Sequence, residues 1–267
     1  MPLSSLKAQE NSSHCSPKTS PFAFEKIEEA AKSDSYKEIM TELAAKKGLS
    51  DLIEKSKPAS FEFEPVVAQE FHMGGHEGEK ARTVKISKSF EIGKVEVTQL
   101  VRYLVTGKNP SHASKAKGFK AFKNWFHGIR NKSFRDSVEL EKTKRAYDHP
   151  IDWISWKDAN AFIEKLNALD SKYVYRLPTD AEWELAAQTY KHDVFEGSLW
   201  EWCQDWYCKT PKDEDNLDPA GPISGSEKVL RGGDLSRFGT KFLDLRGSDS
   251  PQNRYQDVSL RLVRTLK

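Results

Sequence analysis

The sequence predicts an α+β fold, because short stretches with the periodicity of strands alternate along the chain with segments that carry helix start and stop signals. Val258, Leu260 and Leu262 alternate with polar residues, which is the period-2 pattern of a half-buried strand. Thr98 and Ser155 each precede an amphipathic segment in the position of a helix N-cap. Both patterns occur within residues 61–267, which we expect to form the main domain.

The N-terminal part predicts a tail and an accessory helical segment. Residues 1–21, rich in Ser, Pro and Lys, have the composition of a disordered tail. Residues 22–60 carry apolar residues at helical spacing, and Gly48 is placed to end one helix. Ser50 is expected to cap the next helix and Pro58 to stop it. We expect this segment to pack on the main domain, with partner binding as the alternative. Its apolar positions are Phe24, Ile27, Ala31, Tyr36, Ile39, Met40 and Leu43.

The main domain begins with alternating stretches at residues 61–64, 84–86 and 90–92, which predict strands. A helix is predicted from Thr98 through Val105, ended by Gly107. Residues 112–148 are basic and aromatic without a sustained period, and we interpret them as a long excursion with its own small apolar cluster. A nucleic-acid groove is the alternative there, and it is disfavoured by the acidic residues that follow, Asp136, Glu139 and Glu141.

The next helix is predicted from Ser155 through Leu169, with an apolar face of Ala159, Phe162, Ile163 and Leu166. Residues 173–177 predict a short strand. Thr179 and Glu182 then form a capping box, in which each side chain can bond the other residue's backbone amide. The tryptophans that follow, Trp200, Trp202 and Trp206, are interpreted as a structural aromatic cluster.

Composition limits the classes of function. With 42 basic and 40 acidic side chains, the chain lacks the charge excess of a protein whose main ligand is nucleic acid. It has no apolar run long enough to cross a bilayer, and residues 1–21 lack the apolar core of a signal peptide, although removal of a leader stays open. Its three cysteines, Cys15, Cys203 and Cys208, make no disulfide framework; Cys203 and Cys208 could pair or be buried free thiols.

Two patterns that could carry chemistry favour structural explanations. His72 and His76 have a spacing seen in metal sites, but the glycines between them break the helix that would align both rings. Asp180, Glu182 and Glu184 are acidic residues at a helix start, where the helix dipole favours negative charge.

Residues 229–264 are the candidate functional segment. A predicted strand through Val229 and Arg231 runs into Gly232 and Gly233, and the segment ends in the predicted strand at 258–262. The residues between these strands show no sustained period. A long irregular segment held between two core strands is typical of a binding surface.

Motifs in a fixed order resemble the sulfatase-modifying-factor family, the formylglycine-generating-enzyme branch of the C-type lectin fold. The resemblance covers roughly residues 61–264 and implies that fold. It rests on Met73-Gly74, Val95-Glu96-Val97-Thr98, Asn109-Pro110-Ser111, His149-Pro150, Ser155-Trp156, the run from Tyr175 to Glu184, Trp200-Glu201-Trp202, Asp205-Trp206-Tyr207, Val229-Leu230-Arg231-Gly232-Gly233 and Arg261-Leu262-Val263. The resemblance also implies that Arg231, Arg246 and Arg261 hold the irregular segment together.

The chain departs from the enzymes of this family at the positions that carry their chemistry. The enzymes have copper-binding cysteines shortly after the Arg-Gly-Gly motif, whereas this chain has no cysteine after Cys208. Its last histidine is His192, so the histidine cluster of the related iron-dependent enzymes is missing. Ser198 stands where the family has a calcium-binding Asn, and Glu201 alone cannot satisfy calcium. We therefore expect no catalytic residue, no metal site and no cofactor.

The segment also resembles the hypervariable region in variable proteins of diversity-generating retroelements, especially the Treponema variable protein A type. This resemblance implies a bacterial, non-catalytic protein at the cell surface or outside the cell, anchored in some cases as a lipoprotein. It implies a protein or other macromolecular partner and no nucleic acid. The alternative is a sulfatase-modifying enzyme or accessory subunit acting on a protein or peptide. The expected ligand contacts are Asp234, Leu235, Arg237, Phe238, Leu243, Leu245, Gly247, Ser248, Asp249, Ser250 and Tyr255. Burial is the alternative for Leu243 and Leu245.

Overall fold

The computed structural model describes residues 35–75, 81–111, 140, 143–144, 146–190, 199–209, 216–233 and 246–267, and within them it confirms the α+β prediction. The elements in chain order are α2 Ser35–Lys46, α3 Ser50–Lys55, the 3-10 helix η1 Pro58–Phe61, β1 Phe63–Val66, β2 Glu70–Met73, β3 Arg82–Lys85, β4 Phe90–Gly93, α4 Gln99–Thr106, α7 Trp156–Leu169, β5 Tyr173–Arg176, α8 Asp180–Tyr190, β6 Trp200–Trp206, β7 Lys228–Gly232, β8 Arg246–Asp249, β9 Val258–Ser259 and β10 Val263–Leu266.

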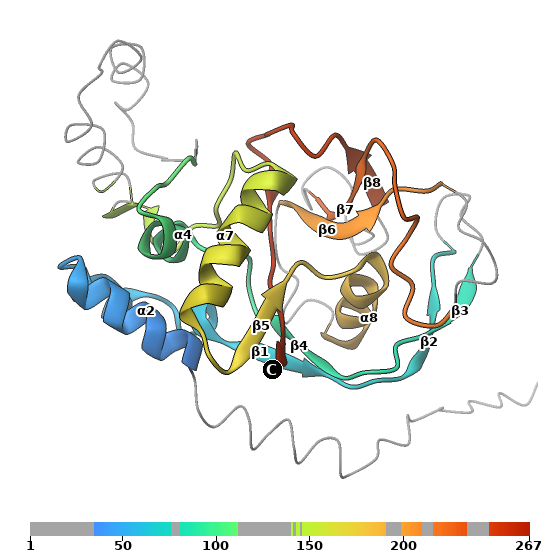
Figure 1. The fold of residues 1–267 in the computed structure, drawn as a ribbon, viewed down its shortest axis with the longest axis horizontal. Coiled ribbons are helices and arrows are strands. Elements are labelled where there is room, and N and C mark those ends of the chain that lie inside the picture. Colours follow the sequence, from blue (N-terminus) through green and yellow to red (C-terminus); the bar gives the residue numbers. More distant parts are fainter. Residues whose placement is uncertain are drawn as a thin grey trace, which may run out of the picture.

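Two four-stranded sheets and one hairpin organise the described residues. The first sheet has the order β1-β4-β10-β5 and is antiparallel, so the C-terminal strand β10 lies between two strands from earlier in the chain. The second sheet has the order β8-β7-β6-β9, and β2 pairs with β3. Figure 1 shows α2, α4 and α7 on one side of the molecule, and α8 between the first sheet and the strands β6, β7 and β8.

The helices of the main domain begin and end where the local sequence signals predict. The Thr98 hydroxyl accepts from the Val101 amide, and α4 ends at Gly107, whose φ of 69° is left-handed. The Ser155 capping box is present, with Asp158 as its acidic member, and the four predicted apolar residues of α7 are all buried. Local capping chemistry therefore fixes where these helices stand on the sheets.

The N-terminal helices belong to the same core as the main domain. Tyr36, Met40 and Ala44 of α2 are buried, and the Tyr36 ring meets the Phe63 ring edge-on at 5.3 Å between centroids. The prediction that Ser50 caps α3 is wrong. The helix begins at Ser50, Leu49 occupies the cap position, and no side chain bonds the free amides; Leu49 is buried and contributes packing instead. Residues 22–34 and most of the excursion at 112–148 lie outside the described residues.

The predicted half-buried strand at 258–262 is also wrong. Residues 258–263 are all buried, including Ser259 and Arg261, and only Val258 and Ser259 at the start of this stretch pair as a strand. This stretch passes from the second sheet to the first, so both of its faces are covered. Leu260 and Leu262 join the hydrophobic cluster of α2, α4 and α7, while Val263 joins the cluster around α8. A polar side chain here must find its partners inside the protein.

None of the helices within the described ranges combines the length and the hydrophobicity needed to span a bilayer.

Candidate functional site

The strands β7 and β8 flank residues 234–245 of the candidate segment. They pair in antiparallel register, and the pair nearest to residues 234–245 is Arg231 with Arg246. The chain leaves this pair through Gly232 and Gly233, and it returns at Arg246. The intervening residues 234–245, and with them the predicted contacts Asp234, Leu235, Arg237, Phe238, Leu243 and Leu245, lie outside the described residues.

One carboxylate joins the two arginines at this base. Arg246 Nε donates to Asp180 Oδ2 at 2.7 Å, and Arg231 Nε lies 3.2 Å from Asp180 Oδ1. The three side chains are between 1% and 7% exposed, so their attraction is weakly screened. We call Arg231, Asp180 and Arg246 the arginine clamp. Because none of its members belongs to residues 234–245, the clamp sets the separation of the two ends of this stretch independently of its side chains.

The arginine clamp is fixed in turn by the start of α8. The predicted capping box is present: the Thr179 hydroxyl accepts from the Glu182 amide at 3.2 Å, and Glu182 accepts from the Thr179 amide at 2.9 Å. This places Asp180 in the first turn, where the helix dipole favours a negative charge. One turn later, Glu184 accepts a hydrogen bond from Arg231 Nη2 and another from the Gly74 amide, the latter at 2.8 Å.

A second buried carboxylate lies beside the clamp. Asp205 accepts from the Asp180 amide at 2.8 Å. Burial, with the nearby charge of Asp180, raises the pKa of Asp205 to about 7.

The ammonium of Lys228 lies 3.7 Å from the ring centroid of Trp206 and 4.2 Å from that of Trp156, and burial lowers the pKa of this ammonium. The two rings stack on each other, which agrees with the structural interpretation of the tryptophans.

The far end of the segment is held by Arg261. Its guanidinium donates to Glu201 at 2.7 and 2.9 Å and to the Gly93 carbonyl at 2.8 Å, and Glu201 also accepts from the Trp183 indole at 2.8 Å. Burial raises the pKa of the neighbouring Glu96 carboxyl. Arg261 thus connects β6, β4 and the buried stretch at 258–263. The three arginines that the family resemblance assigned to structure are all in buried ion pairs.

Two glycines make room for one indole ring under the segment. A Cβ on Gly233, whose φ is 115°, would lie 2.8 Å from Trp200, and one on Gly247 would lie 3.2 Å from the same ring. Gly232 also has a positive φ, 79°. Both glycines therefore adopt backbone conformations that other residues rarely adopt, as the sequence predicted. Gly247, a predicted contact, is placed on the Trp200 ring as a packing position.

The remaining predicted contacts that the structure describes lie at the surface. Ser248, Asp249 and Ser250 are half-buried, and Tyr255 is 41% exposed. Ser248 donates to Glu227 at 2.6 Å. Asn253 Nδ2 donates to Asp249 Oδ1 at 2.8 Å and to the Tyr255 hydroxyl oxygen at 3.3 Å. The structure therefore brings Asp249 and Tyr255 together through Asn253, a residue that the sequence did not single out.

Residues 250–257 are pinned to the start of α7. Arg254 donates to Asp158 at 2.6 and 3.0 Å, and the Trp153 amide donates to the Tyr255 carbonyl at 2.9 Å. Trp153 has a φ of 56°, which is unusual for a bulky residue. Arg254 and Trp153 were missed because their partners are distant in sequence: Asp158 lies 96 residues before Arg254, and no local signal predicts such a pair.

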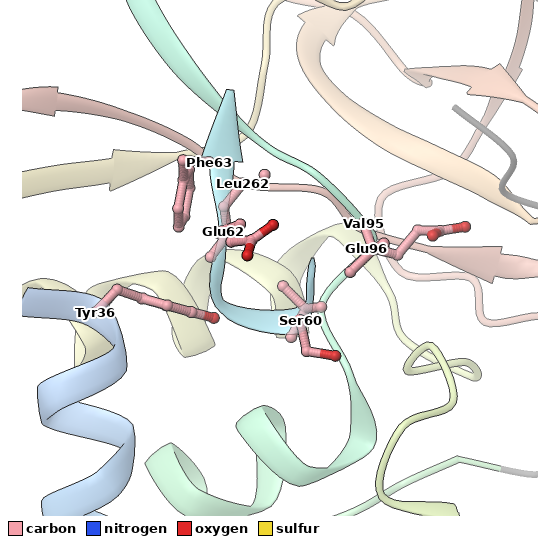
Figure 2. A pocket seen from close by; sticks show the side chains of 9 residues that line it. Tyr36, Ser60, Glu62, Phe63, Val95, Glu96 and Leu262 are labelled. Atoms are coloured by element: carbon pink, nitrogen blue, oxygen red, sulfur yellow. The ribbon is translucent and has the colours of Figure 1, made fainter. Parts of the chain in front are cut away.

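A small cavity lies away from this surface, between α2 and β1 (Figure 2). Its volume of about 10 Å³ is enough for roughly one water molecule, and its lining includes Tyr36, Ser60, Phe63 and Glu96. Cys203 is buried and is a free thiol, and Cys208 is half-buried. Burial raises the pKa of the Cys203 thiol, so it lacks the thiolate character of a reactive cysteine. Among the described residues, no three His, Cys, Asp or Glu side chains are grouped as metal ligands.

Comparisons with known proteins agree with this architecture. Residues 65–195 match the family described as Sulfatase-modifying factor enzyme 1-like domain. The Streptomyces coelicolor formylglycine-generating enzyme is 26% identical over 163 residues, which cover 41% of this chain and 49% of the relative. The chain thus spans about half the length, or less, of the curated relatives it matches.

Two solved structures share the fold. Treponema denticola variable protein 1 has a TM-score of 0.57 and 22% identity, over 75% of this chain and 94% of that one. PvdO from Pseudomonas aeruginosa has a TM-score of 0.52 and 14% identity, over 76% of this chain and 94% of that one. At these identities the likeness concerns the fold, and it confirms the C-type lectin-like architecture expected from the motifs.

Proposed function

We propose that this chain, which carries a sulfatase-modifying-factor-type domain with the C-type lectin-like fold, is a binding protein that displays residues 229–264 to a macromolecular ligand. The observation that carries the proposal is the arginine clamp, in which Asp180 joins Arg231 and Arg246 on either side of residues 234–245 within the displayed segment. A base fixed by buried groups lets the residues between those ends change while the fold persists. The likeness in fold to a variable protein supports the same assignment.

The exposed part of the segment has the composition of a protein-binding surface. It offers serine, asparagine and tyrosine side chains, a mixture that antibody paratopes use because it combines adaptable hydrogen bonding with rigid aromatic contact area. Ser248, Ser250, Asn253 and Tyr255 supply these groups on an anchored backbone. A protein ligand met at the cell surface or outside the cell fits this function best.

The proposal includes the loss of formylglycine-generating activity in this chain. A formylglycine-generating enzyme needs copper-binding thiolates beside the displayed segment, and the chain has no cysteine beyond Cys208. The residues present therefore do not fit a copper site of that kind. Cys203 cannot replace them, because it is buried and its pKa is raised.

The binding proposal is tested by replacing Arg237, Phe238 and Tyr255 together. Binding to a ligand identified with the wild-type protein should be abolished, while the melting temperature should barely move. Unchanged binding would refute the proposal, and a large fall in melting temperature would place these side chains in the core. The gene's flanks provide an independent test: a near-identical repeat with a reverse transcriptase gene supports a diversified segment.

The second candidate is an enzyme or accessory subunit of the sulfatase-modifying kind, which the similarity to formylglycine-generating enzymes favours. A sulfatase peptide incubated with the purified protein and copper separates the two functions. The binding proposal predicts no formylglycine. Turnover that is lost when Cys203 and Cys208 are replaced would contradict it.

A further inference from the structure

A cluster of three side chains on the displayed surface has a chemistry of its own. Asp249, Asn253 and Tyr255, which we call the Asp249 trio, are linked by the two hydrogen bonds that Asn253 donates. Hydrogen bonding to Asp249 also raises the pKa of Tyr255. The trio therefore presents a carboxylate beside the exposed ring of a tyrosine.

The backbone under the trio is held on both sides. Arg254 is bound to Asp158, and the Tyr255 carbonyl accepts from the Trp153 amide. The Asp257 carbonyl accepts from the Trp200 amide at 2.7 Å, and Asn253 closes a turn onto the Ser250 carbonyl at 3.0 Å. This backbone therefore loses little conformational entropy on binding, and less of the free energy of the trio's contacts is offset by ordering.

The charge around the trio is negative among the residues that the structure describes. Glu227 accepts from Ser248, the residue before Asp249, and the charge of Asp257 acts on Tyr255. Three basic residues lie near the trio. Arg254 is bound to Asp158, and Lys157 lies at the start of α7. Lys228, the cross-strand partner of Asp249, donates to the Gln204 carbonyl and lies over the rings of Trp156 and Trp206. A phosphate or an acidic peptide would be repelled here, whereas a cation would be attracted.

We propose that the Asp249 trio binds an arginine side chain of the protein ligand. Asp249 Oδ1 already accepts from the Ser250 amide and from Asn253, so a ligand donor would bind Oδ2. A guanidinium group suits this arrangement, because it can donate to that oxygen and stack on an aromatic ring. A lysine ammonium shares the charge but lacks the planar face, so it binds less tightly. This inference rests on the proposed function and adds the chemistry of the partner.

Titration of a hexa-arginine peptide into the full chain at low ionic strength tests the inference. Hexa-arginine should bind, hexa-lysine should bind more weakly, and hexa-glutamate should not bind. Asp249→Asn should weaken hexa-arginine binding about tenfold, since it removes a charge-assisted hydrogen bond. Tyr255→Phe should retain more affinity than Tyr255→Ser, because it keeps the ring.

Asp51→Asn is the matched control, since it removes an equal charge from an exposed position on α3. It should leave the affinity unchanged. Equal losses in Asp249→Asn and Asp51→Asn would show a response to net charge and overturn the inference, as would failure of hexa-arginine to bind. If an identified ligand still depends on Arg237 and Phe238 while Asp249→Asn has no effect, the arginine contact is refuted and the display function stands.

Discussion

Replacing Asp180 by alanine tests the arginine clamp directly. Asp180, Arg231 and Arg246 have side chains exposed by 6%, 1% and 7%. Removing one partner of a buried ion pair costs up to about 3–5 kcal/mol. Arg231 keeps Glu184 as a partner in this variant, so we expect a loss toward the lower end of that range. The free energy of unfolding should therefore fall substantially in Asp180→Ala.

A part of this cost is offset at Asp205. Its pKa is raised to about 7 first by burial and second by the charge of Asp180. Loss of the Asp180 charge relieves part of this shift, which returns about 1.4 kcal/mol for each pKa unit regained. The net loss expected for Asp180→Ala is thus about 2–4 kcal/mol in denaturant unfolding at pH 7.

The matched control is Arg254→Ala, which breaks the pair with Asp158 at the surface. These side chains are 45% and 30% exposed, and such a pair contributes about 0–1 kcal/mol. Amide exchange at Gly232 and Gly247 should also accelerate in Asp180→Ala and stay unchanged in the control. If Asp180→Ala costs no more than Arg254→Ala, the clamp does not fix the ends of the segment and the reasoning fails.

Two further predictions concern the residues around the clamp. Gly233→Ala should cost roughly 3–5 kcal/mol, since a Cβ there is strained at φ 115° and would lie 2.8 Å from Trp200. Gly48→Ala, at φ 66° with open space around it, should cost only about 1 kcal/mol, and equal losses in denaturant melts would contradict the packing argument. Asp205 has a folded-state pKa of about 7, above its unfolded value, so its contribution to stability falls as the pH rises from about 4 to 7 and is level above that. Wild-type unfolding free energy minus that of Asp205→Asn should therefore fall over this range; a difference that is flat with pH would be inconsistent with this assignment.

Local signals in the sequence predicted much of the fold. The caps at Thr98, Ser155 and Thr179 depend on residues three positions apart, so the chain reveals them without its tertiary structure. Ser50 shows the limit of such signals, because burial of Leu49 took the place of a polar cap.

Contacts between distant residues could not be predicted in this way. Arg261 lies in a period-2 pattern that indicates an exposed face, yet it is buried because Glu201, 60 residues earlier, neutralises it. The pairing of Arg254 with Asp158 is equally invisible. The motif order did indicate that Arg231, Arg246 and Arg261 are structural, although it could not reveal that Asp180 joins two of them.

We infer that the fold is independent of the residues it displays. The most direct measurement is the free energy of unfolding for a panel of variants in which Asp234, Leu235, Arg237 and Phe238 are replaced in many combinations. Most variants should stay within about 1 kcal/mol of the wild type, as expected for surface positions. Typical losses above about 3 kcal/mol, the range of buried side chains, would contradict it.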